Sequence, residues 1–240
     1  MLITFTDDIA GAYDKIVNEI LICQRIAEVY PKNYYAWTYR QLVSDKLQSL
    51  DNVKEQLDVL GKWTKKHVSD HCAYHCRQNL WMKYVELIDI DLSETFLFLL
   101  KSDFLHSELQ TKTFSLENSK CRDLFILCKE EFKFSSHLLV YFPGHEAMWC
   151  HRRKFVIFWI LVIILCPSIH QLVLEDEIPT NSNNNEDDII LEDLSEIFIN
   201  ESEFAKKNIY DSGISRFEVN RKSAISYLYW LSVLVCILHY

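Results

Sequence analysis

The chain has 240 residues, of which 49% are hydrophobic, and a formal net charge of −9 at pH 7. This length permits one large domain or two small ones, and the apolar content excludes a chain that is disordered throughout. An acidic chain lacks the basic surface that phosphate recognition requires, so nucleic acid is excluded as the main partner. The eight cysteines show no paired short spacings, which favours a reducing compartment over a disulfide scaffold.

The first predicted element is an amphipathic helix over residues 7–29, with Asp7 or Asp8 as its N-cap. Its apolar residues recur every three or four positions, and they are Ile9, Tyr13, Ile16, Ile20, Cys23 and Ala27. We expect this helix to pair antiparallel with a helix over residues 33–47. The start of the chain does not join a basic region to a long apolar run, so no signal peptide is predicted and the expected location is cytoplasmic.

Three segments share an aromatic residue followed three positions later by an arginine. They are Trp37-x-x-Arg40, Tyr74-x-x-Arg77 and Trp149-x-x-Arg152, which lie 37 and then 75 residues apart. Self-similarity at such a period predicts stacked helical hairpins, that is, an all-α repeat solenoid with a tetratricopeptide-like superhelix. The predicted first hairpin has no terminal repeat to cover its apolar end, so either the chain is a truncated product or this end packs on something else.

The repeat motif has a structural interpretation. Aromatic and arginine side chains three positions apart lie on one helical face. The ring can fill the gap between neighbouring hairpins, and the five donors of the arginine can bind the carbonyl ends of an adjacent helix. Pro31 and Pro143 stand six positions before Trp37 and Trp149, and proline suits the first turn of a helix. We therefore expect the six motif residues to be buried and structural, not catalytic.

A second hairpin is predicted from a helix over residues 52–66 and a helix that begins after Ser69 or Asp70 and ends near Ile88. Within it, the i, i+4 spacing of histidine and cysteine permits a zinc site, at His71, Cys72, His75 and Cys76. The two cysteines are turned about 100° from the histidines on a helix, and the repeat places His75 and Cys76 among packing residues. Packing is therefore favoured over metal binding, and no metal is expected in this chain.

The remaining segments divide the chain into predicted domains. A helix is expected over residues 94–101, an insertion near 101–120, a helix over 121–141, and a repeat helix from Gly144. The twelve uncharged residues 155–166 are too few to cross a bilayer, so a buried helix is predicted and stable membrane insertion is not. The helical repeat domain then spans 1–165, an acidic, asparagine-rich disordered linker 166–195, and C-terminal helices 196–240. Of these, 223–240 is either a degenerate last repeat, with Tyr227 and Leu228 in motif positions, or a marginal membrane tail; the repeat is favoured.

The motifs resemble a known family. The sequences PKNYYAWTYR at 31–40, HVSDHCAYHCRQ at 67–78 and YFPGHEAMWCHRR at 141–153 are similar to the signature repeat of protein prenyltransferase α subunits, over roughly residues 10–165. The resemblance implies a crescent of helical hairpins wrapped around a β subunit. It also implies that this β subunit carries the zinc, the isoprenoid pocket and most of the protein-substrate site, so no cofactor is expected in this chain.

The resemblance further implies a function and a site. The function is that of an α-type scaffold subunit of a heterodimeric protein prenyltransferase, with a β subunit like that of Rab geranylgeranyltransferase and a protein substrate with a C-terminal cysteine. Lys32, Asn33 and Tyr34 match the family motif that lies at the edge of the diphosphate site. Against this, Lys32 is equally well explained as a solvated turn lysine, and a helical-repeat adaptor without transferase activity is the alternative function. No catalytic residue is expected in the isolated chain.

Overall fold

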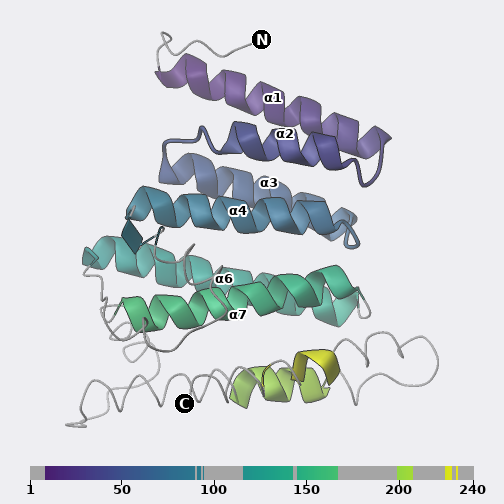
Figure 1. Ribbon diagram of the computed structural model, residues 1–240, viewed down its shortest axis with the longest axis vertical. Coiled ribbons are helices and arrows are strands. Elements are labelled where there is room, and N and C mark those ends of the chain that lie inside the picture. The colour runs from purple at the N-terminus through teal and green to yellow at the C-terminus, as the bar shows by residue number, and fades with distance from the viewer. Residues whose placement is uncertain are drawn as a thin grey trace. The chain divides into compact units, whose positions relative to one another are not determined.

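The computed structural model describes residues 9–89, 91, 92, 94, 116–142, 145–166, 199–207, 225–228 and 231. All the regular secondary structure in these residues is helical (Figure 1). The predicted all-α fold of helical hairpins is therefore confirmed. The chain divides into two compact units, Met1–Ile90 and Asp91–Tyr240, and each is described by itself.

The first unit contains two stacked helical hairpins. Helix α1 (Ile9–Val29) packs against α2 (Tyr34–Ser44), and α3 (Leu50–Lys66) packs against α4 (His71–Ile88) (Figure 1). Contacts between α2 and α4 join the two hairpins. The core between them includes an aromatic pair, because the rings of Trp37 on α2 and Trp63 on α3 pack in a T-shaped arrangement with centroids 5.6 Å apart.

Side-chain caps decide where α2 and α4 begin. Asn33 accepts a hydrogen bond from the backbone N–H of Ala36 at 3.3 Å, and Asp70 accepts from Cys72 N–H at 3.1 Å. Each cap satisfies a donor that has no partner within the helix. The prediction that Pro31 occupies a first helical turn is wrong: Pro31 lies in the preceding turn, because the Asn33 cap sets the start of α2 at Tyr34. The helix also ends at Ser44, earlier than predicted.

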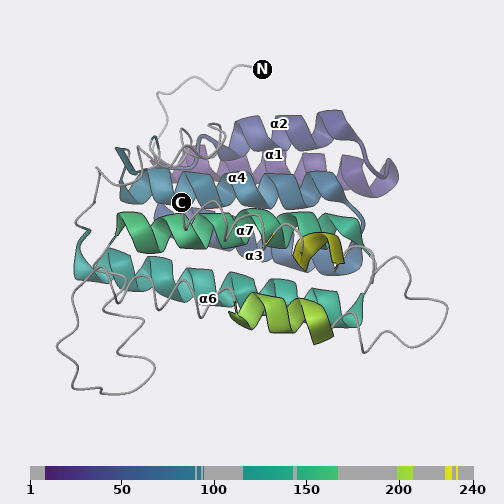
Figure 2. The same ribbon diagram turned by 60° about the horizontal axis from the view of Figure 1, so that its bottom comes forward.

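The second unit contains the hairpin of α6 (Asn118–Tyr141) and α7 (Glu146–Leu165), shown from a second side in Figure 2. Helix α7 begins at Glu146 and not at Gly144, with His145 in the N-cap position. The apolar run after Lys154 is buried from Phe155 to Leu165 wherever its side chains are described, except at Ile157, which is half-buried. Residues 199–207 and 225–228 are also helical. None of the described helices combines the length and the apolar content that a bilayer crossing requires.

Several predictions concern residues outside the described ranges. These are the N-cap at Asp7 or Asp8, most of the helix over 94–101 and of the insertion near 101–120, nearly all of the linker 166–195, and most of 223–240. They stay predictions, as does the division of the chain at residues 165 and 195.

Candidate functional site

Arg40 links the two hairpins of the first unit through a side chain. Its guanidinium donates from Nη2 to Oε1 of Gln56 on α3 at 3.2 Å and lies beside the thiol of Cys76 on α4. Only 1% of Arg40 is exposed, and this burial lowers the pKa of the guanidinium despite the neighbouring thiols. We expected Arg40 to bind the carbonyl end of an adjacent helix. Its acceptor is instead the side chain of Gln56, which lies within α3 and not at its end.

Arg77 also reaches the middle of a helix. It donates from Nη1 to the backbone carbonyl of Leu57, which lies well inside α3. Both Arg77 and the aromatic residue of its motif, Tyr74, are buried. A helix carbonyl has a second lone pair after it accepts its intrahelical bond, so an arginine can bind it without breaking the helix.

Arg152 makes several hydrogen bonds within the described part of the second unit. Its Nε and Nη2 donate to the two carboxylate oxygens of Glu201 at 2.7 and 2.6 Å, and Nη1 donates to the hydroxyls of Ser135 and Ser136 at 2.9 and 2.8 Å. Burial by itself lowers the pKa of Arg152, but Glu201 and Tyr227 oppose this and raise it overall. A bidentate arginine–carboxylate pair is strong and geometrically specific, so Arg152 fixes residues 199–207 to this hairpin.

The histidine–cysteine segment of α4 does not present its side chains as one group. His71 and His75 are exposed, Cys72 is half-buried and Cys76 is buried. Burial raises the pKa of the Cys76 thiol to about 11, although Arg40 partly opposes the shift. In the described part of the chain, no cluster of three or more histidine, cysteine or acidic residues has the geometry to hold a metal ion. Cys76 thus lies in the hairpin contact, whereas the expected packing position of His75 is wrong, because its side chain faces solvent.

The three residues that match the family motif lie at the turn between α1 and α2. Lys32 is exposed and has a φ of 62°, Asn33 is the N-cap of α2, and Tyr34 is 66% exposed. The Asn33 side chain is therefore engaged in capping. The Lys32 ammonium and the Tyr34 phenol both face solvent, and both can donate hydrogen bonds to an anionic ligand.

The backbone at Lys32 gives a first prediction. A left-handed conformation costs a residue with a Cβ about 1–2 kcal/mol, part of which is offset because glycine loses more entropy on folding. Lys32→Gly should therefore raise the free energy of unfolding by about 0.5–1 kcal/mol, as measured by urea denaturation. Lys46→Gly is the matched control, since Lys46 is also an exposed turn lysine but does not have a positive φ, and it should lower stability. Equal effects of both substitutions would contradict the prediction.

The sequence did not reveal the acceptors of the arginines. The backbone carbonyls of Leu57 and Phe132 accept from Arg77 and Arg152, and each lies 20 positions before its arginine. This shared offset was the available signal, and it does not extend to the side-chain acceptors. Glu131 pairs with His151 at 2.7 Å, and both side chains are buried. Glu201 follows Arg152 by 49 positions, which matches no repeat period.

Helical hairpins joined through buried Trp-x-x-Arg motifs define this chain as a helical-repeat protein. A family model, the protein prenyltransferase alpha subunit repeat, matches residues 16–47. These residues include most of α1 and all of α2. The resemblance to protein prenyltransferase α subunits is therefore confirmed, and the chain carries a repeat of this kind.

The curated relatives bear the name of one repeat protein. The chain is 35% identical over 167 residues to protein prenyltransferase alpha subunit repeat-containing protein 1-B of Xenopus laevis, covering 67% of this chain and 36% of the relative. It is 37% identical over 143 residues to repeat-containing protein 1 of Homo sapiens, covering 58% and 35%. For the Danio rerio protein the identity is 30% over 148 residues, covering 59% and 33%. The chain thus spans about a third of the length of these relatives.

Proposed function

We propose that this chain acts as an α-type scaffold subunit of a heterodimeric protein prenyltransferase in the cytoplasm. Its partner would be a β subunit like that of Rab geranylgeranyltransferase, and the reaction would attach a geranylgeranyl group to the C-terminal cysteine of a trafficking or signalling protein. The observation that carries the proposal is the repeat over residues 16–47, whose α1–α2 turn exposes Lys32 and Tyr34.

The chemistry explains why a second subunit is needed. In the transfer, a C–S bond forms while the C–O bond to diphosphate breaks; the thiol loses its proton and diphosphate leaves with the electron pair. A cysteine with a pKa near 8.5 needs a metal or a positive neighbour to become a thiolate at neutral pH. The zinc that would supply this belongs, by resemblance, to the β subunit. In this chain, burial raises the pKa of Cys23, Cys76 and Cys128, which disfavours a thiolate.

The α1–α2 turn would assist at the leaving group. The Lys32 ammonium supplies a point charge and the Tyr34 hydroxyl a hydrogen bond, and such groups lower the barrier when they stabilise the charge that develops on the diphosphate. Asn33 would contribute indirectly, because its cap fixes the start of α2 and hence the position of Tyr34.

The test combines the chain with the β subunit of Rab geranylgeranyltransferase, labelled geranylgeranyl diphosphate and a cysteine-tailed acceptor. Transfer should require both subunits. In the active complex, Lys32→Ala should lower turnover by about tenfold or more with little change in β-subunit affinity, whereas Lys46→Ala, an exposed lysine in the α2–α3 connection, should change neither. Transfer by the isolated chain, or affinity loss without turnover loss, would contradict the assignment.

One observation favours the alternative of a helical-repeat adaptor without transferase activity. The capping role of Asn33 accounts for part of the family motif without any ligand. Failure of the chain to bind a prenyltransferase β subunit would support the adaptor.

A further inference from the structure

The Trp-x-x-Arg motif of α2 fits into a defined socket on the next hairpin. Trp37 and Trp63 pack in a T-shaped arrangement at 5.6 Å between centroids. Arg40 donates to Gln56 at 3.2 Å and lies beside the Cys76 thiol. We call these contact residues the socket. It consists of the hydrogen-bond acceptor Gln56 and the ring of Trp63 on α3, together with Cys76 on α4.

The motif of α7 occupies a socket of the same kind within the second unit. Arg152 binds Glu201, the Tyr227 hydroxyl donates a hydrogen bond to the same carboxylate, and the Trp149 ring lies 5.2 Å from that of Tyr227. In this socket, the acceptor for the arginine is a glutamate whose carboxylate also accepts a hydrogen bond from a tyrosine.

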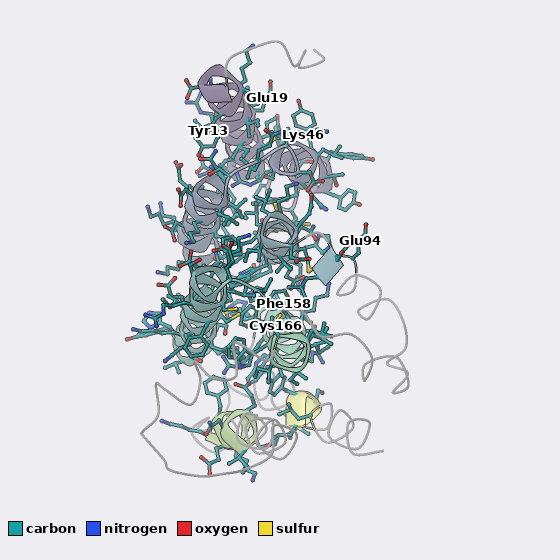
Figure 3. The ribbon with its side chains drawn as sticks, turned by 90° about the vertical axis from the view of Figure 1, so that its left-hand side faces the viewer. Tyr13, Glu19, Lys46, Glu94, Phe158 and Cys166 are labelled. Atoms are coloured by element: carbon teal, nitrogen blue, oxygen red, sulfur yellow. The ribbon has the colours of Figure 1, made fainter. Side chains whose placement is uncertain are left out.

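The first hairpin carries an equivalent socket. Its residues correspond to residues 37 positions later in α3 and α4, as Trp37 corresponds to Tyr74. The equivalents of Gln56, Trp63 and Cys76 are thus Glu19, Ile26 and Tyr39. The Tyr39 hydroxyl donates to Oε2 of Glu19 at 3.2 Å, which reproduces the Glu201–Tyr227 arrangement. Glu19 and Tyr13 lie on different sides of α1 (Figure 3), and Tyr13 binds Glu55 of the second hairpin.

The socket on the first hairpin is exposed, whereas its counterpart is covered. Ile26 is 39% and Tyr39 46% exposed, against 4% for Trp63 and 2% for Cys76. Other large exposed side chains of α1 and α2 extend this apolar surface, namely Ile22, Tyr35 and Leu42. We call Glu19, Ile22, Ile26, Tyr35, Tyr39 and Leu42 the end face. Residues 19, 22 and 26 of α1, and residues 35, 39 and 42 of α2, recur at three and four positions, so each set lies on one helical face. Exposed apolar side chains gathered in this way beside a carboxylate indicate an interaction site.

We propose that the end face docks a helical hairpin that presents a Trp-x-x-Arg motif and lies outside this 240-residue sequence. The arginine of the partner binds Glu19 in a charge-assisted hydrogen bond oriented by Tyr39, and its tryptophan packs on Ile26. A second copy of this chain is the weaker occupant, because all three of its own motif arginines already bind within their units, Arg40 at Gln56, Arg77 at Leu57 and Arg152 at Glu201. This inference does not depend on prenyl transfer.

The experiment adds a hairpin with this motif to the full chain, directly before the end face. A second copy of residues 9–49 is inserted between Asp8 and Ile9, so that the Trp37 and Arg40 of the copy face the socket. Against this background, Glu19→Gln should lower the melting temperature by about 2–4 °C more than it does in the parent chain. Arg40→Ala in the copy should abolish this extra loss, because the two groups act as one pair. Glu28→Gln, an exposed glutamate on the same helix, should cause no extra loss.

Three outcomes would overturn the proposal. The first is strict additivity of the two substitutions. The second is loss of cooperative unfolding on insertion, since a true socket accepts the hairpin. The third is concentration-dependent dimerisation of the parent chain that Tyr39→Arg abolishes, measured by sedimentation, since the occupant would then be a second copy.

Discussion

Replacing Arg152 by alanine is expected to lower the free energy of unfolding of the second unit by about 3–5 kcal/mol, the cost of leaving a buried charge unpaired. Glu201, the partner carboxylate, is only 5% exposed, and it would lose both of its hydrogen bonds from the guanidinium. The hydroxyls of Ser135 and Ser136 would lose a donor as well. Urea denaturation followed by circular dichroism measures the loss.

The control for Arg152 is its neighbour. Arg153→Ala removes the same side chain from the same helix, but Arg153 is half-buried and should cost less than about 1 kcal/mol. Adding Glu201→Gln to Arg152→Ala should restore part of the lost stability, because the amide removes the stranded charge. Equal losses for Arg152→Ala and Arg153→Ala would show that the buried pair does not hold the C-terminal segments.

Arg40→Ala is expected to destabilise the first unit by about 2–4 kcal/mol, from a lost hydrogen bond of a charged group and the volume left empty between the hairpins. The loss should be smaller than for Arg152, because the described acceptor of Arg40 is the neutral amide of Gln56 and the Nε of Arg40 already lacks a partner in the described structure. The neutral acceptor carries no charge that the substitution could strand.

Thermal denaturation tests this prediction. Arg25→Ala is the matched control, since Arg25 is an exposed arginine on α1, and its melting temperature should stay within about 2 °C of the parent value. If the Arg40→Ala and Arg25→Ala variants had the same melting temperature, the structural role assigned to the repeat arginine would be contradicted.

Features encoded over short distances were predictable from the sequence. The amphipathic spacing of 52–66 and 121–141 led to α3 and α6, and the predicted ends of α4 and α6 agree with Ile88 and Tyr141. The Trp-x-x-Arg spacing placed both side chains on one helical face, and all three arginines are buried. Such features depend on one turn or a few turns of helix, so the residues that decide them are neighbours in the chain.

The partners of those arginines were decided by the tertiary structure. Arg40 binds an amide 16 positions away and Arg152 a carboxylate 49 positions away, and nothing in the local pattern distinguishes these acceptors from other polar residues on the same helices. The conformation of Lys32 and the cap at Asn33 likewise depend on how the chain turns between α1 and α2. The sequence by itself determined the helices and the faces that they bury. Only the packing of hairpin on hairpin decided which polar group each buried arginine meets, because a buried donor binds whichever acceptor the neighbouring helix brings within hydrogen-bonding distance.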